Sequence, residues 1–423
     1  MMRFWVWLMV LWASVATGQS QQDMLVARVS IEGIQRHDSI YLQRFLLTRP
    51  GEPFSRVMAG QDAQRLRNVF SVADAGYRLD TFPGQQVAVT FWVEEAWTLF
   101  PILSINGIRN NVWYEIGASE INFLGRGMQL TAAYRNIDGR SNYQVFFRQP
   151  YAGGSSWGYL LGVHRYASTE PLYFAEGTVF YDYTNWSFDA GISYEFTPGH
   201  HLEGSGVYFV EDYQKTAEQV LDNPPGPAGL RILKGLVKLI HRYDRVNHRY
   251  FYRAGFSNTT LLETVYNSDD GSWFNLVLND THYFRRLGRA GNLALRLRLG
   301  LSTNVNSPFA PFVLDSRINI RGAGNRIDRG TGTLVLNLEY RHTLWEGNLL
   351  AVQGVAFSDL GAWRTAGGVF ADFVNPDYIR HFVGPGMRFI YKKAHDAVFR
   401  LDYGFDLHQA GERGLVVGFG QYF

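Results

Sequence analysis

Residues 186–196 read WSFDAGISYEF, an alternation that sets the architecture of the whole chain. Every second side chain from Trp186 to Phe196 is apolar, and the residues between them are small, polar or acidic. Successive side chains of a β-strand point to opposite faces, so this spacing creates one apolar and one polar face. In an α-helix the acidic residues would be scattered around the cylinder. The pattern is typical of a strand that lies between lipid and a wet lumen.

The same alternation recurs along most of the chain after residue 98. Leucines at 293–301 alternate with Arg296 and Arg298, and residues 399–406 alternate apolar with charged or small side chains. Runs of this kind reach ten or more residues, whereas strands of soluble proteins average about five or six. Aromatic residues also crowd the ends of the runs, as in interfacial girdles. A soluble antiparallel sandwich, which alternates too, is therefore the less favoured alternative.

Short and long connections alternate between these runs. Tight turns are predicted near 125–126, 197–200, 244–247, 287–290, 345–348 and 392–396, and long connections near 166–176, 212–230, 303–330 and 359–382. Short periplasmic turns and long external loops are the barrel pattern. The runs number sixteen if residues 178–197 form one strand and seventeen if they do not, and bacterial single-chain barrels favour an even number. The predicted fold is therefore mainly β, a 16-stranded antiparallel transmembrane β-barrel over residues 98–423.

Composition excludes several classes of function. The 423 residues carry a formal net charge of only +2, so there is no electrostatic case for nucleic acid. Cysteine is absent, which excludes a disulfide framework, a thiolate metal site, a cysteine nucleophile and a lipoprotein anchor. The eleven histidines are dispersed, and no Walker-type phosphate loop is present. We expect no metal, no cofactor and no catalytic activity.

The N-terminus has the features of a signal peptide. Residues 1–3 form a short basic start, residues 4–15 are apolar, and Ala16-Thr17-Gly18 supplies small residues for cleavage. A retained anchor helix is the alternative, but the apolar run is shorter than the roughly 20 residues that a membrane span needs. We therefore predict that residues 1–18 are a signal peptide.

Residues 24–95 predict a small α+β domain. A strand at 26–31 is followed by a helix that Asp38 or Ser39 can cap, and prolines at 50 and 53 break the chain before a second helix beginning at Ser55. Two strands near 72–80 and 86–94 complete a β-α-α-β-β order. The connection at 49–55 resembles that of polypeptide-transport-associated (POTRA) domains, although other α+β modules share the same order.

Four stretches give the chain a resemblance to the Omp85 superfamily, including its BamA/TamA-like and surface-antigen D15-like members. Residues 116–127 resemble the second barrel strand of the family and its turn into the third strand. Residues 321–324 lie in the longest external loop and resemble the family's Arg-Gly motif. Residues 357–361 resemble a later-strand motif, and Gly418 to Phe423 resembles the family's C-terminal assembly signal. The resemblance covers nearly all of the mature chain, with a single POTRA domain.

The long loop at 303–330 is predicted to fold into the lumen, because it contains apolar residues such as Phe309 and Phe312. A desolvated guanidinium there needs carboxylate partners. Glu339 lies on the polar face of the next strand, and Asp359 lies near the external end of the strand after it. We predict that Arg321, followed by Gly322, fixes the loop to the wall through Glu339 and Asp359; an arginine in a solvated turn is the alternative.

The resemblance implies a device that inserts or translocates polypeptide without an energy source. The first strand, near 98–105, is short and contains Pro101, and the last, 414–423, contains Gly414, Gly418 and Gly420. A weak seam between these two strands could open laterally and template an incoming strand by β-augmentation, although glycines also accommodate barrel curvature. Tyr77 lies in the strand of the small domain that we expect to receive clients.

The resemblance further implies location in the bacterial outer membrane, with the N-terminal domain and the C-terminus in the periplasm. Expected partners are outer-membrane lipids, unfolded outer-membrane or secreted proteins, and accessory periplasmic or lipoprotein subunits. A passive pore, a lipid-remodelling barrel and the secretion of one dedicated protein are the alternatives. A hydrolase is disfavoured: residues 154–158 spell G-x-S-x-G, but in a strand-turn-strand context that does not expose a nucleophile.

Overall fold

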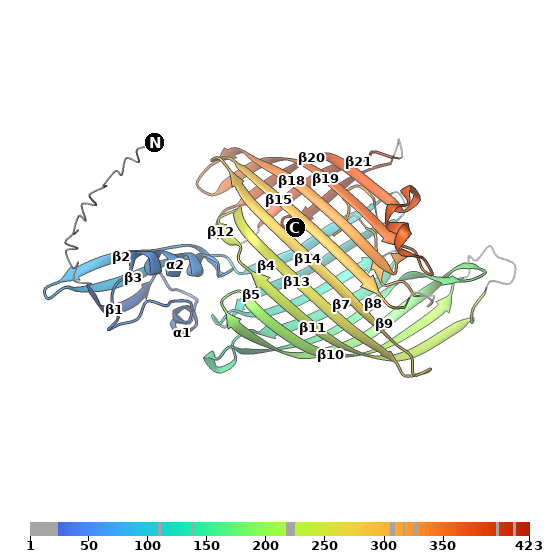
Figure 1. The fold of residues 1–423 in the computed structure, drawn as a ribbon, viewed down its shortest axis with the longest axis horizontal. Helices are drawn as coiled ribbons and strands as arrows, with labels where there is room; N and C mark the ends of the chain where they lie inside the picture. Colours follow the sequence, from blue (N-terminus) through green and yellow to red (C-terminus); the bar gives the residue numbers. More distant parts are fainter. Residues whose placement is uncertain are drawn as a thin grey trace, which may run out of the picture.

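The computed structural model describes residues 24–108, 111–137, 139–216, 225–304, 309–315, 318–324, 329–394, 397–408 and 412–423. A small α+β domain precedes a large β-barrel (Figure 1). The predicted signal peptide lies outside the described residues. Within the described ranges, no helix is both long and apolar enough to cross a membrane.

The small domain has the predicted element order. Its elements are β1 (Leu25–Glu32), α1 (Ser39–Gln43), α2 (Arg56–Arg67), β2 (Val72–Phe82) and β3 (Gln86–Glu95). Side chains of Asp38 and Ser55 accept hydrogen bonds from the first turns of α1 and α2, as N-caps do. The first helix is shorter than predicted, since it ends at Gln43, yet Leu42 and Leu46 are both buried in the domain core.

The sheet of this domain has the order β1-β3-β2, with β1 parallel and β2 antiparallel to β3. The outer edge of β1 is partly covered, because the Val26 N–H donates to the Glu52 carbonyl and the Gly51 N–H donates to the Val26 carbonyl. β2 forms the opposite edge of the sheet. Within the described residues, the segment 51–54 covers only the start of β1, and no main-chain hydrogen bond covers the outer edge of β2.

The barrel confirms the prediction of sixteen antiparallel strands. Its strands are β4 (Leu99–Ile108), β5 (Asn111–Phe123), β6 (Met128–Ile137), β7 (Arg140–Gln149), β8 (Trp157–Phe174), β9 (Gly177–Thr197), β10 (His200–Lys215), β11 (Gly229–Asp244), β13 (Tyr252–Asn267), β14 (Trp273–Leu287), β15 (Gly291–Ser302), β18 (Gly332–Glu346), β19 (Leu350–Arg364), β20 (Ile379–Tyr391), β21 (Val398–Asp406) and β22 (Arg413–Phe419). The three-residue β12 (Asn247–Arg249) continues β11 along β13, and β9 is unbroken, so the count is even.

In the barrel wall, polar side chains are buried and apolar side chains are exposed, the reverse of the pattern in a soluble protein. On β18, Asn337, Glu339 and Arg341 are buried, whereas Leu336 and Leu338, which alternate with them, are exposed. The polar side chains thus face the lumen and the apolar ones face outward. This arrangement is expected for strands with lipid outside.

The predicted long connection at 166–176 is wrong. β8 continues to Phe174 and β9 starts at Gly177, so only two residues join them. A buried cluster that includes Leu172, Val179 and Tyr181 stabilises this extension. The predicted connection at 359–382 is also too long, because β19 reaches Arg364 and β20 starts at Ile379.

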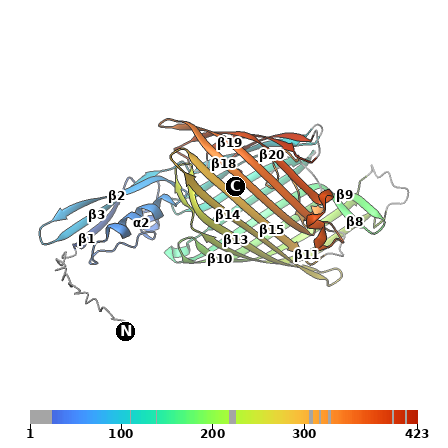
Figure 2. The same cartoon turned by 45° about the horizontal axis from the view of Figure 1, so that its top comes forward.

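The small domain sits at one end of the barrel, called the near end here, in both views (Figures 1 and 2). The Asp38 N–H donates to the carbonyl of Gly125 in the β5–β6 turn, at 2.9 Å. The Arg44 guanidinium carbon lies 3.4 Å from the centre of the Tyr151 ring, in the connection between β7 and β8. On another side of the opening, Lys393 pairs with Glu94. The domain thus contacts several connections around the near end.

Candidate functional site in the barrel lumen

The connection between β15 and β18 returns into the barrel. It contains a small hairpin of β16 (Phe312–Val313) and β17 (Arg329–Gly330), and between these strands it carries Ile320 and Arg321 into fully buried positions. Arg321 was predicted from sequence to lie here. The structure brings it together with both of its predicted partners.

Arg321 is bound by Asp359 and Glu339, and we call these three residues the loop lock. Its Nε and Nη2 lie 2.8 and 2.9 Å from the two carboxylate oxygens of Asp359, the bidentate geometry that suits a planar guanidinium. Its Nη1 donates to Glu339. All three side chains are 0% exposed, so each charge depends on its partners for solvation.

Aromatic rings enclose the same guanidinium. Its central carbon lies 3.8 Å from the centre of the Phe357 ring and 4.5 Å from that of Tyr422. Cations over aromatic faces are attracted by the ring quadrupole, most strongly when water is excluded. Sequence reasoning did not identify Tyr422 as part of the site.

Further charged side chains surround the loop lock inside the barrel. Glu339 also accepts from Arg341 and, at 3.2 Å, from Arg388, and Arg388 donates to Asp402 at 2.7 Å. Arg321, Arg341 and Arg388 thus face the carboxylates of Glu339, Asp359 and Asp402. Three formal positive charges balance three negative ones, which is what makes a buried ionic cluster tolerable.

The loop tip rests against the last two strands of the barrel. Gly404 on β21 is paired with Gly414 on β22. A Cβ on Gly414 would lie 2.7 Å from the carbonyl oxygen of Gly322, and one on Gly404 would meet the carbonyl of Arg321. Gly322 itself has a φ of +93°, which favours glycine. The sequence suggested Gly414 only as a weak point of the seam, whereas the structure shows that it makes room for the loop.

The seam strands differ from their predicted bounds. β4 extends to Ile108 rather than 105, and β22 ends at Phe419 rather than 423. The chain turns at Gly420, whose φ is +82°. Pro101 lies on β4 opposite Ala118, and Gly418 lies opposite Arg400. Phe423, predicted as part of an assembly signal on the last strand, therefore lies outside that strand and packs inside the barrel beside Phe284 and Ala294.

The far opening of the barrel, opposite the small domain, is crossed by the same long loop. Arg329 pairs with Glu170 on β8, and its N–H donates to the Tyr173 hydroxyl at 3.3 Å. Phe309 lies under the ammonium group of Lys234, 5.5 Å from its ring centre. The loop is thus held against β8 and β11 as well as at its tip.

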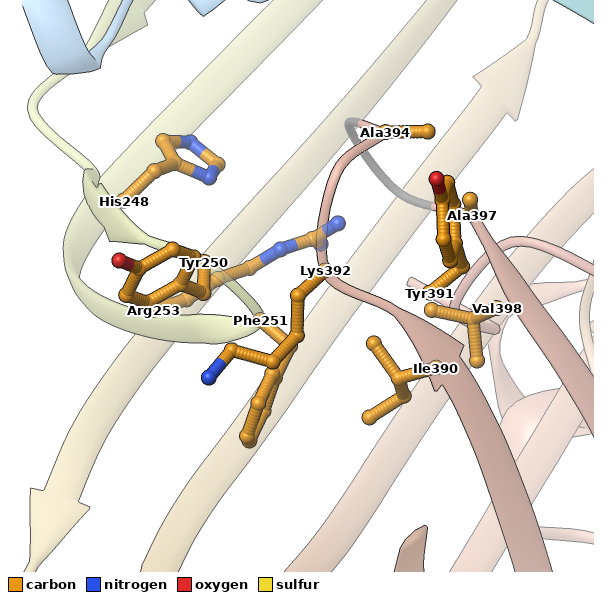
Figure 3. Close-up of a pocket in the computed structure, with 10 residues that line it drawn as sticks. All are labelled: His248, Tyr250, Phe251, Arg253, Ile390, Tyr391, Lys392, Ala394, Ala397 and Val398. Carbon is orange, nitrogen blue, oxygen red and sulfur yellow. The ribbon is translucent and has the colours of Figure 1, made fainter. Parts of the chain in front are cut away.

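At the near end, the turn between β12 and β13 lies against β20 and β21 (Figure 3) and also contacts β19. Phe251 and Tyr252 are buried there among Ala351, Ile390 and Val398. The cavity beside this turn measures about 10 Å³, room for about one water molecule. The structure therefore shows no space for a small-molecule ligand at this point.

Tyr77, the predicted client-receiving residue, lies on the open edge strand β2. It is paired with Phe91 of β3, and the two ring centres are 6.2 Å apart. Its side chain is half-buried, so the backbone edge rather than the ring is the accessible feature.

A cluster in the small domain was not anticipated from sequence. His37 Nε2 lies 2.6 Å from the Ser71 hydroxyl, and His37 Nδ1 lies 2.9 Å from Glu95. This connectivity matches a serine–histidine–acid set, but Ser71 is only 2% exposed. Glu95 also accepts main-chain hydrogen bonds from Gln35, Arg36 and His37, so the cluster ties the β1–α1 loop to the end of β3.

No constellation for metal binding is present in the part of the chain that the structure describes. Ser155, within the G-x-S-x-G sequence, lies between β7 and β8, and its hydroxyl donates to the Ala152 carbonyl at 2.7 Å. This is a strand-turn-strand setting, as expected.

Comparisons with known proteins place this architecture. No family model and no curated protein matches the chain. Several solved structures match it in fold. BamA from Haemophilus ducreyi lacking POTRA domains 1–3 has a TM-score of 0.53 and 14% identity, covering 93% of this chain and 83% of that one. CdiB from Acinetobacter baumannii has a TM-score of 0.58 and 13% identity, covering 95% of this chain and 74% of that one. CdiB from Escherichia coli has a TM-score of 0.60 and 11% identity, covering 94% of this chain and 77% of that one. The chain therefore has the same overall fold as BamA and CdiB.

Proposed function

We propose that this protein is an outer-membrane insertase or translocase of the Omp85 type, which passes polypeptide through a lateral seam between β4 and β22 without its own energy source. The observation that carries the proposal is the closing strand. β22 has seven residues, whereas β9 has twenty-one and β10 sixteen. A short strand contributes few ladder hydrogen bonds, so the barrel is easiest to open where it closes on itself.

The open edge of the small domain supports a route to this seam. β2 offers unpaired backbone groups along an edge strand, and such an edge can bind an extended peptide by β-augmentation. In this proposal the domain is POTRA-like and, with the C-terminus, periplasmic, and residues 1–18 are the signal peptide. Clients are unfolded outer-membrane or secreted proteins, with accessory subunits assisting.

The loop held inside the barrel favours this function over a passive pore. A buried ionic cluster occupies the inside of the wall, and the loop that carries Arg321 also contacts β8 through Arg329. Solute diffusion requires an open aqueous path. A lipid-remodelling barrel would use the same seam and differs only in what crosses it.

Photo-crosslinking in living cells tests the proposal. The probes replace Tyr77 on β2 and Leu415 on β22, which is 57% exposed on the outward face. Matched controls replace Leu25, which is 46% exposed and lies on β1 where residues 51–54 cover its edge, and Leu338, an outward residue of β18 away from the seam. Capture of other outer-membrane precursors at Tyr77 and Leu415, but not at the controls, supports an insertase, and capture of one dominant protein supports dedicated secretion. If folded protein captures no polypeptide at either site, the proposal fails.

A further inference from the structure

A hairpin at the near end folds over the lumen instead of continuing the barrel wall. It consists of residues 245–255, which include β12, and we call it the near-end hairpin. Its backbone departs from strand geometry at Gly255, whose φ is +129° and where an added Cβ would lie 2.1 Å from the Arg245 carbonyl oxygen. Only glycine adopts such a conformation readily. Gly255 is therefore the bend of the hairpin.

The stem of this hairpin lies against the inner face of the wall. β13 pairs with β11 and β12 along one edge and with β14 along the other, so a continuous wall would keep residue 246 away from β14. Val246 is nonetheless buried against Phe284 of β14 and Ala294 of β15. The buried side chain of Asn292 on β15 also accepts from the Arg253 N–H at 3.0 Å and donates to the Arg253 carbonyl at 2.9 Å. The stem is thus folded inward over β14 and β15.

The tip of the hairpin continues in the same direction around the barrel. The Tyr252 hydroxyl lies 2.9 Å from the hydroxyl of Thr343 on β18. Phe251 and Tyr252 are both buried against β19, β20 and β21, as Figure 3 shows for Phe251 beside Ile390. The hairpin therefore lies over the near ends of β14, β15, β18, β19, β20 and β21, which are consecutive in the barrel. It covers this part of the near opening.

A second set of contacts joins the near-end hairpin to the small domain. The side chain of Asn68, at the end of α2, accepts from the His248 N–H and donates to the side chain of Asn247, both at 3.2 Å. Gln64 Nε2 donates to the His248 carbonyl at 3.2 Å. The rings of Phe70 and His248 meet edge to face, 6.1 Å between centres. The hairpin is thus held by the wall and by the small domain together.

One further contact joins the hairpin to the edge strand β2. The Tyr250 hydroxyl donates to Asp74 Oδ2 at 3.4 Å, and Asp74 lies on β2. Tyr250 has a φ of +53°, a backbone conformation that bulky side chains rarely adopt. Such a conformation persists only where the surrounding contacts fix it. The position of the hairpin therefore depends on its contacts with the wall and with the small domain.

We propose that the near-end hairpin is a lid over this part of the near opening, and that the small domain controls it. With α2 seated on β12 the lid is closed, as in this structure. When the domain moves away, the lid loses its hydrogen bonds with Gln64 and Asn68 and swings about Gly255. The lid thereby couples the position of the small domain to access to the lumen. That a polypeptide paired with β2 displaces the domain rests on the proposed function; the lid itself does not.

Pulsed electron paramagnetic resonance of the full-length protein in lipid nanodiscs tests the lid. The chain has no cysteine, so spin labels at Arg249→Cys and Leu349→Cys, both exposed, report the distance from the hairpin to the β18–β19 turn. Gln64→Ala with Asn68→Ala is expected to convert one narrow distance distribution into a broad one that includes longer distances. Both labels lie on the barrel, so movement of the domain itself does not contribute. Val57→Ala, at a 71% exposed position on the same helix, should retain the narrow distribution.

Chemical labelling shows whether the lid covers the lumen. Ala294→Cys places a thiol under Val246, at a position that is 0% exposed. The double variant in α2 is expected to raise its labelling rate about tenfold, because opening is a local equilibrium and neutral hydrogen bonds of the closed state are lost. Phe251→Ala, which removes the tip from its buried site, should raise the rate at least as much. Phe256→Ala, at an exposed position on the outward face of the wall, is the matched control and should leave the rate unchanged.

The two measurements decide between a lid and a fixed part of the wall. An unchanged distance distribution and labelling rate in the double variant overturn the inference, even where Phe251→Ala changes both, because the small domain would then not control the hairpin. Lid opening without crosslinking at Tyr77 and Leu415 supports the lid and removes the proposed function. Crosslinking with an immobile hairpin does the reverse.

Discussion

Asp359 binds both the side chain and the main chain of Arg321. Its Oδ2 accepts from the Arg321 N–H at 3.0 Å and from Nε at 2.8 Å, and its Oδ1 accepts from Nη2 at 2.9 Å. One carboxylate on β19 therefore fixes the position of the guanidinium and of the loop backbone together. Lysine could replace the charge of Arg321 but not this geometry.

Removal of Arg321 is expected to destabilise the barrel by about 3–5 kcal/mol, because Asp359 and Glu339 would remain buried without their cation. Arg321→Ala should lower the temperature at which the folded form is lost on heat-modifiability gels. Arg321→Lys should lower this temperature less, but still below the wild-type value. Arg78→Ala, which breaks a pair with Glu32 that is more than half exposed, is the control and should change little. Wild-type stability and function in Arg321→Ala would falsify the role of the loop lock.

Gly414→Ala is expected to displace the loop tip, since the new Cβ would meet the Gly322 carbonyl. Overpacking of this kind costs about 1–3 kcal/mol. The chain has no cysteine, so a single Ala323→Cys, at a buried position, reports loop exposure by its labelling rate. Labelling should accelerate in Gly414→Ala but not in Gly235→Ala, where an added Cβ has nothing within 4 Å. Equal rates in the two variants would show that the loop does not depend on Gly414.

Arg329→Ala is expected to loosen the loop over the far opening, because the pair with Glu170 is lost. The measurable result is increased ionic conductance in planar bilayers. Arg140→Ala, which breaks the more exposed pair with Asp182, serves as the control and should leave conductance unchanged. High conductance already present in the wild type would favour the passive-pore alternative.

Arg44→Ala is expected to loosen the small domain from the near end. Arg44 covers the Tyr151 ring and donates to the carbonyls of Gly154 and Ser155 at 3.3 and 3.0 Å. Losing the cation–π contact alone costs on the order of 2 kcal/mol when water is excluded. Distances between spin labels on the domain and on the barrel should broaden in this variant and not in Arg78→Ala. Unchanged distance distributions in both variants would show that other contacts hold the small domain against the barrel.

Glu95 gives the β1–α1 loop a dependence on pH. Burial raises the pKa of the Glu95 carboxyl, but hydrogen bonds from Arg36, Gln35 and His37 outweigh this effect and hold it below its ordinary value of 4.5. A carboxyl with a lowered folded-state pKa stabilises the fold above the unfolded-state pKa, and this contribution is lost as the pH falls through the lower, folded-state value. Protection of the 35–37 amides from hydrogen exchange should therefore weaken below about pH 4.5.

Glu95→Gln is expected to lose this protection at neutral pH and to remove the pH dependence. Glu32→Gln, at an exposed carboxylate of β1, is the matched control and should retain the wild-type profile. Identical profiles in wild type and Glu95→Gln would show that the loop is held by other contacts.

The sequence by itself determined the barrel and which side chains face the lumen, because alternation with period two is a property of each strand alone. It left sixteen or seventeen strands open, and the unbroken β9 of the structure decided for sixteen. It also placed Glu339 and Asp359 on the inner face, since both follow from the phase of their strands. N-cap residues such as Ser55 could also be predicted from the sequence, because the capping hydrogen bond is local.

Only the tertiary structure decided what meets inside the barrel. The approach of Gly322 to Gly414 and the inward turn at Gly420 that brings Tyr422 onto Arg321 both unite segments that are distant in the sequence. Such contacts depend on the register of every strand around the closed wall and on the course of the loop within it. No local pattern encodes them, because closure of the barrel fixes those positions collectively.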